Sequence, residues 1–419
     1  MCFIVVKYRK YKDDIGENMR ILFYQWGTFN EPVIEKTLRD LGHFVKVLQA
    51  EESREKPTEE QIWALAKDAS EYHADALFSV DYFQTVAMAA KKLDITYYSW
   101  LYHIPQWSLF SYAAQLPNNR IITFDSAQMQ ELRQYNVNGM QYMSQAADKE
   151  LLTSALANAT PEQVEKYKAE VSFVGTLYES ANNLFNRISA EAREKDIYKE
   201  ILEMIKDKRF SYGKGVLGRG VTEEMVEFLL EEVEYGQDHF FFANQEDIAI
   251  QSVLARKITV EERKLMARTL ARKFDFKLYT ISNTEKFPEI NNCGPVDFAK
   301  HAPLVYKGSK INIYVTPRAI RSGVPLRVLE IMACQGFVLV NYQEDLAKEF
   351  EDGKELVMYR SLDEMVEKVQ YYLEHEEERK QIARAGYEKV LREYNYATKL
   401  RKIFEQKPSA IIQNMRDNY

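Results

Sequence analysis

The residues best suited to chemistry lie in one segment, from residue 306 to residue 359. An apolar run over Ile311–Val315 predicts a buried strand, and the loop after it leads into a helix predicted over Leu326–Ala333. Arginine side chains bind diphosphates through paired hydrogen bonds, and free N–H groups at a helix start favour an anion. Gly323 permits close approach of the backbone. The residues predicted to hold a diphosphate are Thr316, Arg318, Arg321, Ser322, Gly323 and Arg327.

Glu330 adds a second chemical group to the same helix. It lies one turn after Arg327, on the face where a carboxylate can accept hydrogen bonds from ribose hydroxyl groups. The loop and the helix together therefore predict a site for a ribose and its diphosphate. The alternative is that Arg327 and Glu330 pair with each other on a solvated helix surface.

Motifs for other kinds of catalysis are absent. The sequence has no Walker A lysine motif, no H-E-x-x-H, no metal-binding cysteine spacing and no G-x-S-x-G elbow. No Asp-x-Asp occurs, which weakens any sugar transfer that holds a diphosphate through a divalent metal. The segment Gly213–Gly218 matches G-x-G-x-x-G, but it follows a predicted helix and opens no βαβ unit. We expect no metal and no cofactor.

Composition narrows the class of protein. The chain has 419 residues, of which 46% are hydrophobic and 28% charged, enough for two or three domains with sizeable cores. Its net charge is −7, whereas a nucleic-acid binder needs a cationic surface. Three widely spaced cysteines form neither a disulfide framework nor a zinc site, and no apolar run approaches the ~18 residues of a membrane span. We expect a cytoplasmic protein without a nucleic-acid partner or a membrane span.

Strands alternate with helices through the first half of the chain. Apolar runs predict strands over Arg20–Gln25 and Phe44–Leu48, and apolar residues at helical spacing, ended by Gly42, predict a helix between them. Such a βαβ unit implies a parallel sheet. The alternation continues with strands over Ala76–Val80, Ile95–Leu101 and Ile121–Asp125 and with helices over Phe83–Lys92 and Ala127–Tyr135.

The second half of the chain is a second α/β domain with more helix. A strand over Val171–Val174 opens it, and helices are predicted over Leu184–Lys206 and Thr259–Phe274. Thr259 and Glu262 have the spacing of a capping box. We predict two doubly wound, Rossmann-like domains. The predicted divisions are a tail over residues 1–18, an N-terminal domain over 19–165, a C-terminal domain over 166–386 and C-terminal helices over 387–419.

Residues 322–333, SGVPLRVLEIMA, resemble the donor-site signature of GT-B glycosyltransferases. In that signature two glutamates are separated by seven residues; Glu330 matches the second, and Ser322 stands in place of the first. The segments GFVLVNY, FEDGKELVMY and VSFVGTLY, and the tail RKQIARAGYEKVLREYNYATKLRKIF, resemble the CgeB-like (spore maturation) glycosyltransferase family. The resemblance spans most of residues 19–405.

This resemblance implies a fold, a reaction and partners. It implies a GT-B fold, in which two Rossmann-like domains face each other across a cleft and the last helix returns to the first domain. The implied activity is a metal-independent, hexosyltransferase-type transfer from a nucleotide-diphosphate sugar bound by the C-terminal domain. The implied acceptor, on the N-terminal domain, is an envelope polysaccharide, a lipid-linked glycan or a protein. The absence of the first glutamate leaves a rival: a catalytically silent GT-B protein with a structural, coat or sugar-nucleotide-binding role.

Residues after predicted strands of the first domain are catalytic candidates. His103 follows the strand over Ile95–Leu101 and is predicted as a general base or a ligand of a sugar hydroxyl group; the alternative is a structural histidine. Asp125, at the end of the next strand, is a second catalytic candidate. Gly27, in the first strand–helix turn, is predicted to lie on the acceptor side, unless it only forms a tight turn.

Two further positions complete the predicted donor site. Gly175 and Thr176 follow the first strand of the second domain, where a glycine turn lets donor phosphates approach; the alternative is an ordinary turn. Tyr306 precedes the donor-site strand and is predicted to border the base, although a structural role fits it equally.

Overall fold

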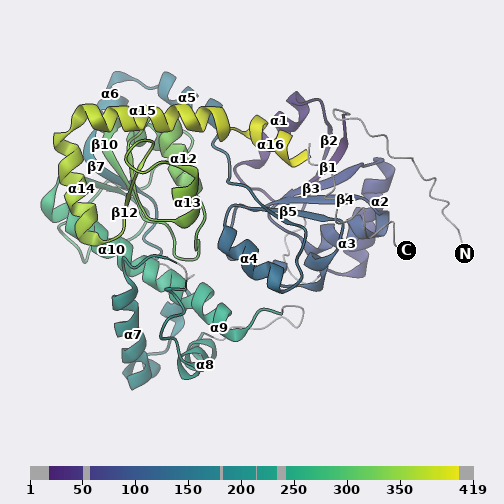
Figure 1. Cartoon of the computed structure of the whole chain (residues 1–419), viewed down its shortest axis with the longest axis horizontal. Coiled ribbons are helices and arrows are strands. Elements are labelled where there is room, and N and C mark those ends of the chain that lie inside the picture. Colours follow the sequence, from purple (N-terminus) through teal and green to yellow (C-terminus); the bar gives the residue numbers. More distant parts are fainter. Residues whose placement is uncertain (1–17, 51–56, 180–182, 214, 234–241, 405–419) are drawn as a thin grey trace, which may run out of the picture.

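Two parallel six-stranded sheets, each flanked by helices, form the described part of the molecule (Figure 1). The computed structural model describes residues 18–50, 57–179, 183–213, 215–233 and 242–404. All but the last residue of the predicted tail (1–18), and the end of the predicted C-terminal segment from residue 405 onward, lie outside this part. The predicted fold class, with two doubly wound α/β domains, is confirmed.

The first sheet has the strand order β2-β1-β3-β4-β5-β6. Its central strand β3 (Ala76–Val80) is buried over its whole length because helices cover both faces of the sheet. The chain adds β2 on one side of β1 and then β3 on the other, so the strand order reverses between β1 and β3. The other elements are β1 (Arg20–Gln25), β2 (Phe44–Gln49), β4 (Thr96–Trp100), β5 (Asn119–Thr123), β6 (Met140–Tyr142), α1 (Glu31–Asp40), α2 (Glu59–Glu71), α3 (Gln84–Leu93) and α4 (Ser126–Gln134).

The second sheet repeats this plan with the order β12-β11-β10-β7-β8-β9, and its order reverses between β7 and β10. Helices α5 (Lys149–Ala157) and α6 (Pro161–Lys166) connect the two sheets. Its strands are β7 (Ala169–Val174), β8 (Phe276–Tyr279), β9 (Asn291–Asn292), β10 (Ser309–Tyr314), β11 (Val338–Asn341) and β12 (Val357–Tyr359). Its helices are α10 (Ala255–Lys273), α11 (Ala302–Gly308), α12 (Leu326–Ala333), α13 (Glu344–Glu349), α14 (Leu362–Glu374) and α15 (Glu376–Glu393).

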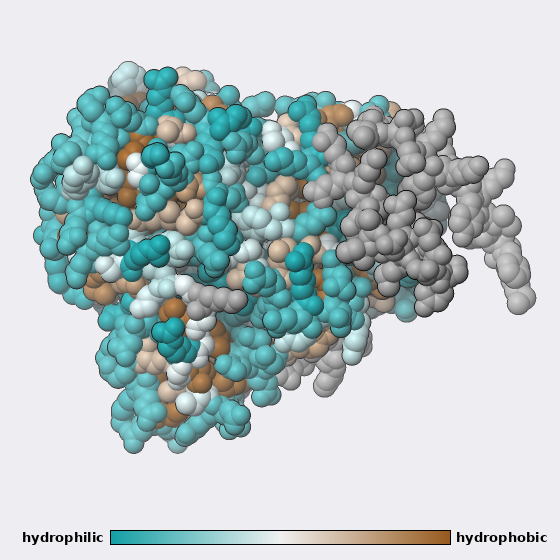
Figure 2. Space-filling model, viewed as in Figure 1, coloured by the Kyte–Doolittle hydropathy of each residue, from teal (hydrophilic) through white to brown (hydrophobic). Residues whose placement is uncertain are grey.

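A helical lobe is inserted between β7 and β8 and projects below the second sheet in Figure 1. It contains α7 (Asp196–Lys208), α8 (Glu223–Glu232) and α9 (Gln245–Ile248), and it has its own core around Ile201 and Leu229. Apolar and polar side chains are mixed on its visible surface (Figure 2). The single helix predicted over Leu184–Lys206 is wrong, because two short 3₁₀ turns precede α7.

The predicted capping box at Thr259 is also wrong. Helix α10 already begins at Ala255, so Thr259 lies inside it, and its hydroxyl donates a hydrogen bond to the carbonyl oxygen of Ala255 (2.8 Å). Glu262 is fully buried instead of capping a helix end. A π-helical turn over Ala249–Leu254 leads directly into α10, so Thr259 lies inside continuous helix.

The last described helix, α16 (Tyr396–Phe404), belongs to the core of the first domain. Helix α15 runs along the second domain, and α16 continues beyond it to pack beside α1 (Figure 1). Leu400 and Ile403 are buried against Phe23 and Trp100 of the first sheet. The two domains are therefore joined by both the α5–α6 connection and the α15–α16 connection.

Candidate functional site

Ligands of doubly wound sheets bind beyond the carboxyl ends of the strands, where the strand order reverses. In this protein the rule selects the turns after β1 and β3 in the first sheet and after β7 and β10 in the second. Those turns carry Gly27, Asp81, Gly175 and Thr316, and the turn after β4 carries His103. The candidate site is built from these two edges.

His103 is paired with a buried carboxylate. Its Nδ1 atom lies 2.6 Å from Oδ2 of Asp81, and because a carboxylate only accepts hydrogen bonds, Nδ1 carries the proton. Asp81 is fully buried, and its Oδ1 accepts hydrogen bonds from the backbone N–H groups of Tyr102 (2.8 Å) and His103 (3.1 Å). The imidazole is 54% exposed. A held Nδ1 and an exposed ring leave Nε2 as a proton acceptor, which is the arrangement of a general base.

The turn after β1 offers open space beside this histidine. Gly27 has φ +92°, and apart from its two chain neighbours no described residue has an atom within 4 Å of a Cβ placed on it. The N–H groups of Trp26, Gly27 and Thr28 donate to the carboxylate of Glu31 at 2.8, 2.8 and 3.0 Å, so an internal anion already uses them. The Trp26 ring lies edge-on to His103, with centroids 5.6 Å apart. Gly27 therefore leaves open space beside His103, and its N–H group is not available to an external anion.

Asp125 connects the two domains. Its Oδ2 accepts hydrogen bonds from the backbone N–H groups of Arg321 (2.7 Å), Ser322 (3.1 Å) and Gly323 (3.3 Å) in the loop before α12. Its Oδ1 accepts a hydrogen bond from the N–H group of Gln128 (2.9 Å) and thereby caps α4. Both oxygens of this fully buried carboxylate are used, so the geometry speaks against the predicted catalytic role of Asp125.

The second domain makes the reciprocal contact. Asp345, on α13, accepts hydrogen bonds from the backbone N–H (2.8 Å) and the hydroxyl (2.5 Å) of Ser126 at the start of α4. The Ser322 hydroxyl donates to Asp345 (2.7 Å) and accepts a hydrogen bond from the N–H of Ala127 (3.0 Å). Each domain thus supplies a carboxylate that binds N–H groups of the other. We call Asp125, Ser126, Ser322 and Asp345 the interdomain clasp.

The first domain covers the loop before α12, although the sequence predicts that this helix start is open to a ligand. A Cβ placed on Gly323 would lie 2.5 Å from the carbonyl oxygen of Phe124, so only glycine permits this contact between the domains. Ser322, Gly323 and Val324 are all buried. The predicted anion site in this loop is therefore occupied by the carboxylate of Asp125.

Two of the predicted diphosphate ligands are held by protein partners. Arg321 forms an ion pair with Glu131 of α4, across the domain boundary. Arg318 is 6% exposed, lies 3.6 Å from the buried carboxylate of Glu262, and stacks over the ring of Tyr212 at 4.8 Å. Burial raises the pKa of Glu262, and Arg318 opposes that shift. Neither guanidinium group faces an open diphosphate site in this conformation.

Arg327, Glu330 and Tyr306 do come together. Nη1 of Arg327 lies 2.5 Å from Oε2 of Glu330 and donates a hydrogen bond to the Tyr306 hydroxyl (2.8 Å). The charged side chains are 21% and 13% exposed, so the pair is more buried than the surface pairing considered as the alternative. Burial raises the pKa of Glu330 and the Arg327 guanidinium opposes the rise, while Arg327 itself stays charged.

Arg263, which the sequence analysis did not identify, connects the turns after β7 and β10, where the strand order of the second sheet reverses. It is 2% exposed and donates hydrogen bonds to the carbonyl oxygens of Thr176 (2.6 Å, from Nη1) and Val315 (2.6 Å, from Nη2). Gly175 and Thr176 thereby lie beside the end of β10. Thr316 is fully buried, and its N–H donates to Oδ1 of Asn341 (2.7 Å). These hydrogen bonds hold the turns after β7 and β10 together. Thr176 is the exposed residue in this group.

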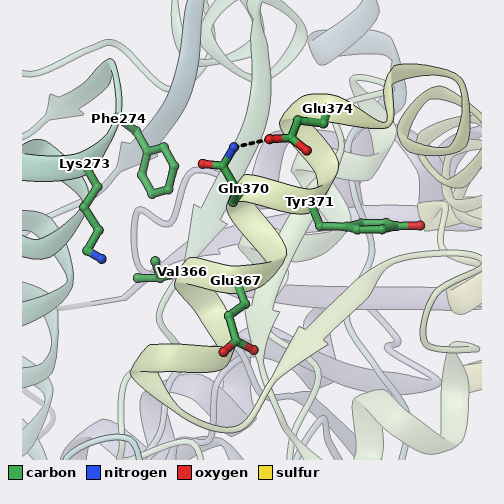
Figure 3. A pocket seen from close by; sticks show the side chains of 7 residues that line it. All are labelled: Lys273, Phe274, Val366, Glu367, Gln370, Tyr371 and Glu374. Carbon is green, nitrogen blue, oxygen red and sulfur yellow. Dashed lines mark hydrogen bonds between the residues drawn. The ribbon is translucent and has the colours of Figure 1, made fainter.

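A separate groove lies away from this edge (Figure 3). Helix α10 ends shortly before β8 begins, and the groove lies between that helix end and the second half of α14, so it borders the amino ends of the strands. We exclude it from the candidate site for that reason. Its lining residues are Lys273, Phe274, Val366, Glu367, Gln370, Tyr371 and Glu374.

Among the described residues, no three His, Cys, Asp or Glu side chains are grouped so that they could hold a metal ion. In the same part of the chain, no helix has both the length and the apolar character needed to cross a membrane.

The architecture is that of GT-B glycosyltransferases. A glycosyltransferase from Rickettsia africae aligns over 93% of this chain and 98% of its own, with a TM-score of 0.52 and 13% sequence identity. A putative UDP-N-acetylglucosamine 2-epimerase from Listeria monocytogenes aligns over 96% of this chain and 98% of its own, with a TM-score of 0.50 and 10% identity. At these identities the likeness defines the fold.

Sequence comparison points to the same class for the second domain. Residues 256–405 match the family described as glycosyl transferase-like. No curated protein sequence matches the chain. The matched segment contains Arg263, Arg327 and Glu330, so these three residues lie in the part of the chain that is similar to glycosyl transferases.

Proposed function

We propose that this protein transfers a sugar from a nucleotide-diphosphate donor to an acceptor hydroxyl group. The observation that carries the proposal is the match of residues 256–405 to a glycosyl transferase-like family, because that segment includes Glu330 and Arg327 on α12. In the proposal the donor lies on the second domain, with its ribose hydroxyl groups on Glu330 and its diphosphate near Arg327. The acceptor lies on the first domain, beside Gly27 and His103.

The chemistry requires a proton acceptor and a stabilised leaving group. In the proposed reaction Nε2 of His103 takes the proton of the acceptor hydroxyl as its oxygen bonds to the sugar, and the nucleoside diphosphate leaves with the electron pair. Asp81 holds the imidazole and stabilises it once it is protonated. The guanidinium of Arg327 offsets the negative charge that develops on the departing diphosphate.

The finer parts of the proposal follow the sequence resemblance. We propose a CgeB-like, hexosyltransferase-type enzyme that works in the cytoplasm and needs neither a metal nor a cofactor. The acceptor is an envelope polysaccharide, a lipid-linked glycan or a protein. We propose an acceptor domain over residues 19–165 and a donor domain over 166–386. The segment over 387–419 begins inside α15 and returns to the first domain through α16.

The proposed donor class is tested by thermal unfolding with UDP, GDP and dTDP, followed by a screen of the matching nucleotide sugars with EDTA present. A ligand of the folded state at a hundred times its dissociation constant adds about 2.7 kcal/mol to the unfolding free energy. We expect one nucleotide to raise the melting temperature and its sugar derivative to be hydrolysed slowly. A sugar-nucleotide epimerase is an alternative enzyme of this fold. Nucleotide release that depends on an acceptor would indicate sugar transfer and exclude epimerisation. No shift with any nucleotide would refute the proposal.

One observation favours a second candidate. Ser322 stands where the related signature has its first glutamate, and its hydroxyl is used by the interdomain clasp. A GT-B protein that binds a sugar nucleotide without turnover, with a structural or coat role, fits this replacement. Nucleotide binding with neither hydrolysis nor transfer across the acceptor classes above would support this candidate over the enzyme.

A further inference from the structure

Phe298 is an exposed aromatic residue at the carboxyl edge of the second sheet. It lies in the loop that connects the end of β9 to α11, and 52% of its surface is exposed. Single exposed aromatic residues are common, so exposure alone assigns nothing to it. The loop that holds Phe298 and the side chains beside it indicate a role.

The loop holds this ring in a defined place. Oδ1 of Asp297 accepts hydrogen bonds from the N–H groups of Ala299 (2.9 Å) and Lys300 (2.8 Å). The carbonyl oxygen of Asp297 accepts hydrogen bonds from His301 and Ala302, both at 2.9 Å. The backbone on both sides of Phe298 is therefore fixed before any ligand arrives, which lowers the ordering cost of binding.

One face of the ring rests on a charged group of the candidate donor site. The guanidinium carbon of Arg327 lies 4.2 Å from the ring centroid of Phe298, and the same guanidinium binds Glu330 at 2.5 Å. The ring and the carboxylate thus contact the same side chain. Because the guanidinium covers one face and half of the residue is exposed, the opposite face of the ring is open.

We propose that the open face of Phe298 stacks against the nucleobase of the donor. This inference rests on the proposed function and adds the residue that recognises the nucleoside. A nucleoside joins a flat aromatic ring to a ribose diol, and the site offers a phenyl face beside a carboxylate that can accept hydrogen bonds from a diol. Stacking on a phenyl ring does not depend on the hydrogen-bonding edge of the base, so Phe298 supports the binding of nucleosides as a class.

The test compares binding of UDP, GDP and dTDP with binding of inorganic pyrophosphate, which lacks a base. The full-length wild-type protein and its Phe298→Ala, Phe298→Trp and Phe44→Ala variants are titrated calorimetrically. Phe44 is 56% exposed at the start of β2, on the amino edge of the first sheet, and serves as the matched control. The melting temperature of each variant without ligand checks that it is folded.

For Phe298→Ala we expect the nucleotide that binds best to lose about tenfold to a hundredfold in affinity, in line with the loss of one base stack. Pyrophosphate binding should stay unchanged, Phe298→Trp should restore nucleotide affinity, and Phe44→Ala should behave as the wild type. Equal nucleotide affinity of wild type and Phe298→Ala would overturn this inference alone. A parallel loss of pyrophosphate affinity would overturn it as well, because the ring would then act on the phosphates. A wild-type protein that binds no nucleotide would overturn the proposed function and this inference together.

Discussion

Asp125 of the first domain binds the backbone of Arg321 in the second, with 2.7 Å between Oδ2 and the amide nitrogen. The same oxygen also accepts hydrogen bonds from the next two N–H groups of the loop. A loop whose sequence suggests an anion site is thus filled by an anion from the opposite domain. This contact is therefore one of those that hold the two domains together.

Loss of the clasp should loosen the two domains. We expect Asp125→Ala to lower the unfolding free energy by about 1–3 kcal/mol, because buried N–H groups lose their acceptor. It should also increase the radius of gyration measured by small-angle X-ray scattering. Asp148→Ala is the control, since Asp148 caps α5 as Asp125 caps α4, and its capping bond stays within one helix. If both variants scatter alike, the clasp does not set the domain arrangement.

Asp81→Asn should impair the chemical step while leaving donor binding intact. An amide can hold Nδ1 in the wrong tautomer and cannot stabilise the protonated ring, so we expect kcat to fall about a hundredfold or more. The KM for the donor should be unchanged. Steady-state kinetics with the donor found in the nucleotide screen measure both constants, with Asp40→Asn on the exposed face of α1 as the control. An unaltered kcat would remove the pair of His103 and Asp81 from the mechanism.

Glu330→Gln should weaken nucleotide binding. A neutral amide accepts weaker hydrogen bonds from the ribose than a carboxylate does, and we expect about tenfold lower affinity. Calorimetric titration with the ribonucleotide and with its 2′,3′-dideoxy form separates the causes. The substitution should affect the ribonucleotide and leave the dideoxy form almost unchanged. A similar loss for both forms would assign Glu330 a role in folding or in holding Arg327.

Lys399 should give stability a distinctive pH dependence. It is 5% exposed on α16, donates a hydrogen bond to Ser144 (2.8 Å), and burial lowers its pKa from 10.5 to about 8. The unfolded chain therefore binds more protons than the folded one between pH 8 and 10.5. The unfolding free energy should rise over that interval by up to about 1.4 kcal/mol per pH unit from this group.

Urea denaturation across this interval tests the prediction. Relative to the wild type, Lys399→Met should lack the rise, whereas Arg401→Met, on the exposed face of the same helix, should retain it. Parallel pH profiles of the wild type and Lys399→Met would show that Lys399 titrates alike in the folded and unfolded states.

The sequence predicts the central strands of the two sheets better than the short strands at the sheet edges. The bounds of β1 and β3 agree with the predicted ones because continuous apolar runs mark strands buried on both faces. Helix α12 also begins and ends where predicted. Strand β9 has two residues and β6 three, too few to show a period, and they were missed.

The candidate site could be predicted where a local signal marks it, either helical spacing or, as for His103, a position after a predicted strand. Arg327 and Glu330 lie one turn apart, so helical spacing already places them together. Asp81 and Asp345 were missed, although Asp81 directly follows a predicted strand. Their partners come from other segments, and no local pattern reports that Asp345 meets Ser126, which is 219 residues away. Arg321 likewise pairs with Glu131, a residue distant in sequence, and not with a ligand.

Helix α16 has a consequence for how the protein is made. It supplies Tyr396, Leu400 and Ile403 to the core of a sheet whose strands lie at the other end of the chain. During synthesis the ribosome exposes β1 to β6 long before it releases these residues, so that face of the first sheet stays uncovered while the second domain emerges. The first domain is therefore completed last, although it is translated first.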